Sequence, residues 1–306
     1  MVIYAARRIL ASLPILLLAV TAVFFAFQLI PGDPAQLFVG PDASQDVVEA
    51  VRRDLGLDRP VYVQYVEYLR RLFRGDLGLS VTTRLPVTEE LGRRFFNTVK
   101  LAIAGITIAT IGGLFLGTIA AVRQGTVVDH LASVVALLGI SIPVFWLGLL
   151  LMYLFSVHLR LLPTSGNDTW RHYFMPTVSL ATFSLAFIAR MTRSSLLEVI
   201  RQDYVRTARA KGVPEYLVVG YHALRNALLP VTIVVGLRFG YMLGGAVVTE
   251  EVFAWPGMGR LLVTAVGQRD IPVIQGALLL FAASFVFVNM AVDLLYGFLD
   301  PQIRYN

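Results

Sequence analysis

The sequence predicts an all-α polytopic membrane protein with six transmembrane helices. Three observations indicate this class: 57% of the 306 residues are hydrophobic, only 15% are charged, and the mean hydropathy is +0.70. A chain this apolar is too hydrophobic to remain in solution, and most of it is expected to lie in lipid. A helix needs about 20 mainly apolar residues to cross the bilayer, so long apolar runs mark the spans.

Six apolar runs have the required length. They are Ile9–Ile30, Thr98–Val122, Leu131–Val157, Phe174–Met191, Ala227–Thr249 and Val273–Tyr296. The first run follows two arginines, as in a signal peptide, but it is too long for one, and we expect a retained span. The fourth run is the shortest, and Pro176 is expected in its first turn, where proline is tolerated.

The basic residues predict the orientation. The segment Arg190–Arg225 carries seven basic and three acidic residues, a net charge of 7 − 3 = +4, and the opposite short loops carry fewer basic residues. Short loops rich in arginine and lysine stay in the cytoplasm, so both termini are expected there. Because the basic residues gather at the ends of apolar runs, they indicate topology and contact with lipid headgroups, and nucleic-acid binding is not expected.

Three regions follow from this topology: residues 1–30 form the N-terminus and first span, 31–97 an extracytoplasmic insert, and 98–306 a five-helix core. The insert is predicted to be a small helical subdomain. Ser44 can cap a helix that ends at Gly56, and Pro60 can open a second helix that ends at Gly75. It has little apolar mass of its own, and we expect it to pack on the spans or on a neighbour.

Small residues recur every fourth position in two spans, which places them on one helix face. They are Gly105, Ala109, Gly113 and Gly117 in the second span, and Gly236, Gly240 and Gly244 in the fifth. Close helix packing within one subunit is the first interpretation. An interface with a second membrane subunit is the alternative.

Polar residues inside the spans are few, which disfavours a transporter driven by ion gradients, since such proteins usually bury acidic or histidine relays. Three of them are candidates for a transport pathway: Arg238, Asn289 and Asp293. A buried partner is an equal alternative for Arg238. Asp293 lies near the cytoplasmic end, where snorkelling or an ion pair is favoured over transport chemistry.

Catalytic signatures are missing from the sequence. It contains no HExxH, no GxSxG and no cysteine, so no catalytic residue or metal site is predicted. It also has no GxxxxGK[ST] motif, and its only lysines are Lys100 and Lys211. We therefore expect no cofactor in this chain, and any ATP must be bound by another subunit.

The cytoplasmic loop after the fourth span has the pattern of two helices. The capping-box pattern Ser195-Leu-Leu-Glu198 predicts a helix start, and Gly212 predicts its end. Pro214 can open a second helix that leads to Pro230 and the fifth span. A basic loop held at anionic headgroups is the alternative, although such a loop needs no glycine at a helix stop.

Arg206-Thr207-Ala208, followed after three residues by Gly212 and later by Leu224-Arg225, resembles the EAA loop of binding-protein-dependent ABC importer permeases. Arg206 stands where glutamate is usual and Arg225 where many members have proline, which is the style of the peptide branch. The resemblance covers the whole chain. The further motifs are Pro31-Gly32-Asp33-Pro34, Leu55-Gly56-Leu57-Asp58 with Pro60, Gln64-Tyr65, Gly75-Asp76-Leu77-Gly78-Leu79-Ser80, Glu251-Val252-Phe253, Pro256-Gly257-Met258-Gly259, Arg269-Asp270 with Pro272, and the tail Asp300-Pro301-Gln302-Ile303-Arg304-Tyr305.

The resemblance implies the type I ABC importer permease fold in a bacterial or archaeal cytoplasmic membrane. It also implies half of a translocation pathway for dipeptides, oligopeptides or glutathione, with a nickel importer as the alternative and a gradient-driven secondary transporter as a weaker one. The implied partners are a second homologous permease, two ABC ATPase subunits that bind ATP and Mg²⁺, and an extracytoplasmic substrate-binding protein.

Two sets of site residues follow from the resemblance. The EAA-type loop at 192–226 is expected to dock the ATPase, and its docking residues are Arg206, Thr207, Ala208, Arg209, Lys211 and Gly212, with Ala208 and Gly212 allowing close approach. A Trp-Pro-Gly turn after the fifth span is expected either to form an extracytoplasmic gate or binding-protein contact or to be a structural turn. Its residues are Phe253, Trp255, Pro256, Gly257 and Gly259.

Overall fold

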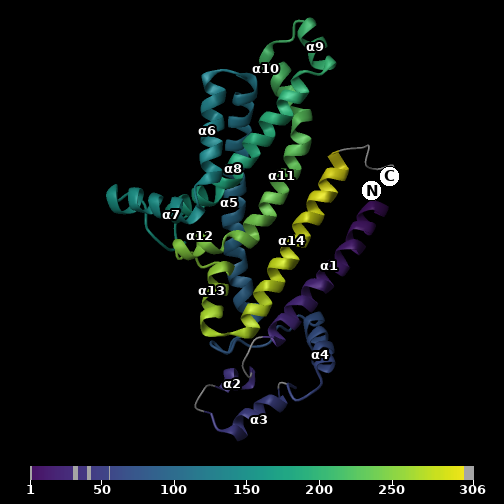
Figure 1. The fold of residues 1–306 in the computed structure, drawn as a ribbon, viewed down its shortest axis with the longest axis vertical. Helices are drawn as coiled ribbons and strands as arrows, with labels where there is room; N and C mark the ends of the chain where they lie inside the picture. Colours follow the sequence, from purple (N-terminus) through teal and green to yellow (C-terminus); the bar gives the residue numbers. More distant parts are fainter. Residues whose placement is uncertain (1, 30–33, 40–42, 55, 300–306) are drawn as a thin grey trace.

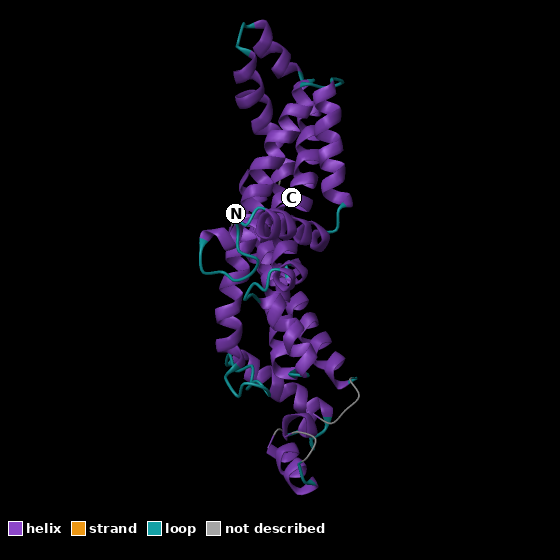
Figure 2. Ribbon diagram, turned by 90° about the vertical axis from the view of Figure 1, so that its left-hand side faces the viewer, coloured by secondary structure: helices purple, strands orange, loops and turns teal. Residues whose placement is uncertain are grey.

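A computed structural model describes residues 2–29, 34–39, 43–54 and 56–299. Within these ranges the chain is helical almost throughout, and the only β pairing is a single bridge between Leu79 and Pro86 (Figure 2). Five segments are long and apolar enough to cross a membrane, and one bent helix pair can supply a sixth span. The predicted all-α, six-span class is confirmed. The long helices are α1 (Val2–Gln28), α5 (Val87–Val122), α8 (Trp170–Ile200), α11 (Leu224–Gly245) and α14 (Ile271–Leu299).

The spans form an elongated bundle in which α5, α8, α11 and α14 run side by side (Figure 1). The start of α1 and the end of α14 lie close together, which fits an even number of crossings (Figure 1). Several predicted features fall on residues outside the described ranges: the end of the first span at Ile30, the motif residues Pro31, Gly32, Asp33 and Leu55, and the motif of the tail, Asp300–Tyr305.

The expectation of one continuous third span over Leu131–Val157 is wrong. The chain forms α6 (Val127–Ser141) and then α7 (Val144–Met152), which continues as a π-helical turn to His158, with a bend of 100° between the two. Pro143 causes the break, because it has no N–H to donate and holds Ile142 in an extended conformation (ψ 121°). As a result α7 lies across the long helices instead of along them (Figure 1).

The fourth span is longer than expected. Helix α8 begins at Trp170, after the N-cap residue Thr169, and continues to Ile200. Pro176 therefore lies six residues inside the helix and not in its first turn. Ser195 is buried in the interior of α8, where its Oγ donates to the carbonyl oxygen of Ala227 at 3.1 Å. The predicted helix start at Ser195 is wrong, because no breaker separates it from the preceding span.

Helices α5 and α8 pack through the predicted small residues. A Cβ added at Gly113 would lie 2.6 Å from Ile188, and one added at Gly117 would lie 2.6 Å from Thr192, so both positions need glycine for this approach. Leu101, Ala109 and Ile188 belong to the main buried cluster formed there. The interpretation as packing within one subunit is confirmed for this face.

The three glycines of α11 differ in whether they contact another helix of the chain. Gly236 and Gly240 face α14, where an added Cβ would meet Val292 and Phe285 respectively, so they too serve packing within the chain. A Cβ at Gly244 would meet nothing within 4 Å. For Gly244 the alternative, a contact with a second membrane subunit, stays a prediction.

The segment after α1 contains α2 (Pro34–Val39), α3 (Gln45–Asp54) and α4 (Val61–Phe73). The two predicted helices are confirmed: α3 follows Ser44, α4 follows Pro60, and Gly56 and Gly75 adopt positive φ at the turns that end them. Helix α4 packs on α1, where the hydroxyls of Tyr65 and Thr21 lie 2.6 Å apart. Helix α5 starts at Val87, eleven residues before the expected start of the second span.

Short helices lie at the two turns between the remaining spans. Helices α9 (Asp203–Ala210) and α10 (Glu215–Leu217), with the π-helical turn Val218–Ala223, connect α8 to α11. Helices α12 (Val247–Val252) and α13 (Met258–Gln268) connect α11 to α14. The first pair extends beyond the bundle at one end, and the second pair is packed beside α5 and α7 (Figure 1).

Candidate functional site

The α9 element, defined as residues 201–223, reverses the chain between α8 and α11. Gly212 ends α9 in a left-handed conformation (φ +76°). The N–H of Gly212 donates to Arg209 O at 2.9 Å, and the N–H of Val213 donates to Ala208 O at 3.3 Å. These two bonds form a Schellman motif, which favours glycine at the left-handed position. The predicted helix stop at Gly212 is confirmed, while the chain also breaks earlier, at Arg201 and Gln202.

The underside of the α9 element packs onto the ends of the spans. Val205 and Ala208 of α9 share a buried cluster with Leu196 of α8, Ala121 of α5 and Val218. This apolar contact holds the element against the bundle. Motion of the element is therefore expected to move α8 and α5 with it.

Two polar contacts brace the α9 element, and sequence reasoning missed both. The guanidinium of Arg209 donates twice to the carboxylate of Glu215, at 2.7 and 3.1 Å, which joins α9 to α10 across Gly212. Asn226 of α11 donates to the hydroxyl of Tyr204 at 2.7 Å. A basic residue and an acidic residue on either side of a helix-stop glycine could have indicated the first contact. The paired carboxylate raises the pKa of Arg209 above its ordinary value.

The outward face of the α9 element carries most of the predicted docking residues. Arg206, Thr207, Lys211 and Gly212 are exposed, and Arg206 has 76% of its side chain accessible. Ala208 is 8% exposed and faces the interior cluster. The expectation that Ala208 lies on the docking surface is therefore corrected: its small side chain allows α9 to approach the spans.

The Trp-Pro-Gly turn at the other end is buried. Phe253 and Trp255 are 2% and 0% exposed, and Gly257 and Gly259 are buried as well. The indole N–H of Trp255 donates to Asn97 O at 3.2 Å, and its ring packs edge-on against Tyr173. The burial of these four residues favours the structural interpretation of the turn. A role as an extracytoplasmic gate or binding-protein contact stays a prediction.

Glu250 organises this turn and was missed by sequence reasoning. Its carboxylate is fully buried and accepts hydrogen bonds from the Thr98 hydroxyl at 2.6 Å and from the N–H groups of Gly259 and Arg260 at 2.7 and 3.2 Å. The two N–H groups lie in the first turn of α13, where a carboxylate stabilises the helix. Burial raises the pKa of Glu250, while the hydrogen bonds from Thr98 and the two N–H groups oppose that change.

Arg238 lies in a pocket of about 360 Å³ between α8 and α11, which Arg190 also lines. Its guanidinium sits over the ring of Phe187, 3.6 Å from the centroid, and 5.8 Å from the ring centre of Tyr241. In the part of the chain that the structure describes, no carboxylate forms an ion pair with Arg238. Since an arginine in a span is costly in lipid, this face is expected to meet water or protein.

The other two pathway candidates lie on α14. Asp293 forms an ion pair with Arg8 of α1 at 2.8 Å, which is the interpretation favoured for it from the sequence. Asn289 is half-buried one turn earlier. A second ion pair was not anticipated: Arg193 of α8 donates twice to the buried carboxylate of Asp129, at 2.7 and 2.8 Å, and fixes the start of α6 to α8.

Comparison with known proteins gives the same family over both parts of the chain. The family described as "Binding-protein-dependent transport system inner membrane component" matches residues 113–305, and the corresponding N-terminal family matches residues 1–102. The glutathione transport system permease protein GsiC of Escherichia coli (strain K12) is 47% identical over 303 residues, which is 99% of each chain. The protein of the same name from Salmonella typhimurium (strain LT2) has the same identity and coverage.

Two solved structures share the fold. An inward-facing structure of the MetNI methionine ABC transporter aligns with a TM-score of 0.59 at 20% identity, covering 69% of this chain and 96% of that one. An amino acid ABC transporter crystallised with histidines aligns with a TM-score of 0.52 at 18% identity, covering 70% of this chain and 94% of that one. The expected importer permease fold is confirmed.

Proposed function

This chain belongs to the family of binding-protein-dependent transport system inner membrane components, and we propose that it forms half of the translocation pathway of an ATP-driven importer of short peptides. Glutathione is the first candidate substrate, because the permeases that are 47% identical along the whole chain carry that name. The observation that carries the proposal is the α9 element, which combines an apolar underside on the spans with an exposed basic outer face.

The importer has the following parts. A second, homologous permease completes the pathway, two ABC ATPases bind ATP and Mg²⁺, and an extracytoplasmic binding protein delivers the substrate. The chain lies in the inner membrane as a multi-pass protein with both termini in the cytoplasm. In this orientation the α9 element faces the ATPases, and α2–α4 face the binding protein.

The α9 element transmits the motion of the ATPase to the spans. Closure of the ATPases on ATP pushes its outer face, where Arg206 and Lys211 are exposed. The Arg209–Glu215 ion pair and the apolar cluster under Val205 keep the element rigid, so that the push reaches α8 and α5. The pathway then changes between two arrangements that face opposite sides of the membrane.

The substrate pathway passes the face of α8 and α11 that carries Arg238. This face holds a cation without a carboxylate partner among the described residues, and it is walled by aromatic rings. A carboxylate of a short peptide is a suitable transient partner for that guanidinium. Asn289 and the Asp293–Arg8 pair lie on the neighbouring helix α14 and remain weaker candidates.

Reconstitution of the complete importer tests this function. Both permeases, both ATPases and the binding protein are placed in vesicles, and ATP hydrolysis is measured with glutathione, a panel of di- and oligopeptides, and nickel. Stimulation by glutathione or a peptide, together with its uptake, is expected. Stimulation by nickel alone, or hydrolysis that no substrate changes, would contradict the peptide assignment.

The same vesicles test the role of Arg238. Arg238→Ala is expected to lower substrate uptake per ATP hydrolysed at least about tenfold, since it removes a charge-assisted contact. Arg238→Lys keeps the charge and should retain part of the uptake. An unchanged substrate response in Arg238→Ala would remove this residue from the pathway.

A further inference from the structure

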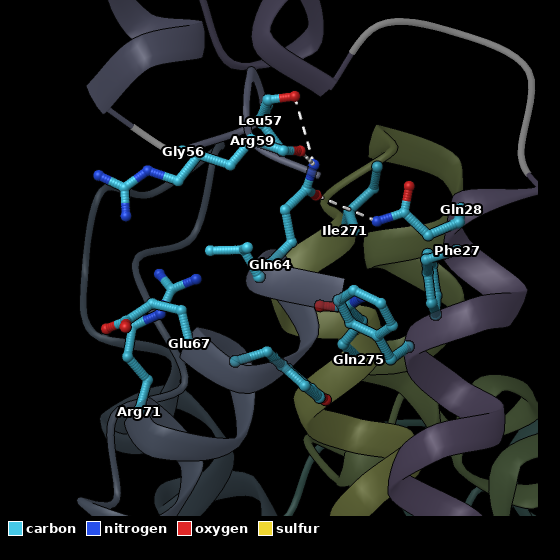
Figure 3. Close-up of a pocket in the computed structure, with 13 residues that line it drawn as sticks. Phe27, Gln28, Gly56, Leu57, Arg59, Gln64, Glu67, Arg71, Ile271 and Gln275 are labelled. Atoms are coloured by element: carbon cyan, nitrogen blue, oxygen red, sulfur yellow. Dashed lines mark hydrogen bonds between the residues drawn. The ribbon is translucent and has the colours of Figure 1, made fainter. Parts of the chain in front are cut away.

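A second pocket lies between α4 and the ends of α1 and α14 (Figure 3), and it shares no lining residue with the pocket of Arg238. Its volume is about 180 Å³. Helix α1 contributes Gln28, α4 contributes Gln64, Tyr68 and Arg71, and α14 contributes Gln275, while Arg59 lies on the loop before α4. Three separate segments thus bring polar side chains to one small cavity.

The pocket carries a net positive charge. Two arginines, Arg59 and Arg71, line it, and Glu67 is the one acidic side chain among the lining residues. Glu67 already accepts a hydrogen bond from Arg70 at 3.4 Å. Among the described residues, the side chains of Arg59 and Arg71 form no hydrogen bond or ion pair, so their guanidinium groups, each with several N–H donors, are available to a negatively charged ligand.

The amide N–H groups of Gln64 and Gln28 in the pocket already have acceptors: Gln64 donates to Leu57 O and Arg59 O, and Gln28 donates to the side-chain oxygen of Gln64. The hydroxyl of Tyr68 is buried and has no hydrogen-bond partner in the described part of the chain. A buried hydroxyl left in this state is costly. Burial raises the pKa of Tyr68 to about 12, so the hydroxyl keeps its proton. The amide oxygen of Gln64 is already occupied by Gln28 at 3.2 Å. This set of groups suits an oxyanion.

The position of the pocket indicates where the oxyanion comes from. Gln28 ends the first span and Gln275 lies in the first turns of the last span, so the pocket is at the level of the membrane surface. Large apolar side chains beside it are exposed: Leu29 is 84% and Phe73 is 87% accessible, and Tyr62 and Val66 of α4 are exposed as well. A helix with basic residues on one side and exposed apolar residues on the other is suited to the lipid headgroup region.

We propose that this pocket binds the phosphate group of an anionic phospholipid, with the guanidinium groups of Arg59 and Arg71 and the hydroxyl of Tyr68 as donors. The acyl chains of the lipid then lie against the exposed apolar side chains of α1 and α4. The bound lipid would fasten α4 to the spans α1 and α14 on the extracytoplasmic side. This inference is independent of the transported substrate.

Native mass spectrometry of the intact importer in detergent tests the site. After removal of endogenous lipid, dioleoylphosphatidylglycerol is titrated into the wild type, into Arg59→Gln/Arg71→Gln and into Tyr68→Phe. The control is Arg53→Gln/Arg74→Gln, which removes the same charge from exposed positions of α3 and the end of α4 that do not line the pocket. We expect one tightly held lipid per chain, with affinity lowered about 30-fold in the first variant and several-fold in Tyr68→Phe.

Competition distinguishes a lipid from a soluble ion. Inorganic phosphate in excess should not bind the pocket when dioleoylphosphatidylcholine is the only lipid. In a separate titration it should not displace bound dioleoylphosphatidylglycerol. Displacement by inorganic phosphate would assign the pocket to a soluble oxyanion and overturn the lipid assignment. Equal loss in the control variant, or full affinity in both test variants, would show that the pocket does not hold the lipid phosphate.

Discussion

The two turns that join the long helices of the core use their side chains in opposite ways. The α9 element keeps its apolar residues underneath and exposes Arg206 and Lys211. The α12–α13 turn buries Phe253 and Trp255 and encloses the carboxylate of Glu250. The α9 element thus presents an exposed basic surface, whereas the α12–α13 turn encloses its aromatic and acidic side chains.

The difference shows that a sequence motif alone does not tell whether a turn binds a partner or stabilises the bundle. Both turns contain a glycine at a helix boundary and lie next to a span. Burial separates them, because an exposed arginine is available to a partner, whereas a tryptophan at 0% exposure is not. Substitutions in the α12–α13 turn should therefore change the stability of the permease. Substitutions on the outer face of the α9 element should change the binding of a partner subunit.

The largest effect is expected for Glu250→Ala. The substitution leaves the Thr98 hydroxyl and two N–H groups of α13 without an acceptor in a buried site, which costs about 4 kcal/mol. The unfolding midpoint of the purified complex should fall by roughly 10 °C. Glu251→Ala is the matched control, because Glu251 is exposed. Equal midpoints for the two variants would show that the turn does not depend on the buried carboxylate.

Gly212→Pro should damage transmission from the ATPase and leave the spans folded. Proline cannot adopt φ +76° and removes the N–H that donates to Arg209 O. ATP hydrolysis should continue while uptake per ATP falls about tenfold or more, which corresponds to about 1.4 kcal/mol or more in coupling. Gly220→Ala is the control, since that glycine has ordinary φ and open space around it. Normal uptake by Gly212→Pro would end the proposal that the α9 element acts as a lever.

Arg206→Glu should weaken ATPase binding without unfolding the permease. The side chain is exposed, and its reversal of charge is expected to raise the dissociation constant of the ATPase about tenfold at low salt and less at high salt. Titration of the ATPase onto permeases in nanodiscs measures this. Arg123→Glu is the control, because Arg123 is exposed at the same end but outside the α9 element. Similar weakening in both variants would mean that only general charge matters.

The smallest expected effect is a dependence on pH of the stability that Glu250 gives to the α12–α13 turn. Because burial raises the pKa of Glu250, the folded protein binds a proton more readily than the unfolded chain does. The contribution of Glu250 to stability is therefore complete below the ordinary carboxyl pKa and falls as the pH rises through the raised value. The unfolding midpoint of the wild type relative to Glu250→Gln should be higher at about pH 5 than at about pH 8. A difference that does not change with pH would contradict this.

Local signals were predictable from the sequence. Gly212, Gly56 and Gly75 end helices where a left-handed residue is needed, and each adopts positive φ. The apolar runs predicted the spans because their length is set by the bilayer. The small residues at intervals of four predicted a helix face for close packing, and Gly113 and Gly117 of α5 provide that packing against α8.

Features that depend on distant residues were not predictable. The pattern at Ser195 is typical of a helix start, but burial against Ala227 keeps it inside α8. The apolar run Leu131–Val157 was expected as one span, because its length fits the bilayer, and the bend that Pro143 produces within it was missed. Glu250 gains its role only when Thr98, 152 residues away, is brought beside it.

The bend at Pro143 has a consequence for the surrounding lipid. Helix α6 contains 15 residues, which gives it a length of about 22 Å, whereas the hydrocarbon core of a typical bilayer is about 30 Å thick. With α7 turned aside by 100°, α6 cannot match that thickness on its own. A span this short is matched to the membrane by local thinning of the bilayer, by snorkelling of flanking side chains or by contact with a neighbouring subunit. The acyl chain length of the membrane is then one of the conditions that sets the shape of this importer.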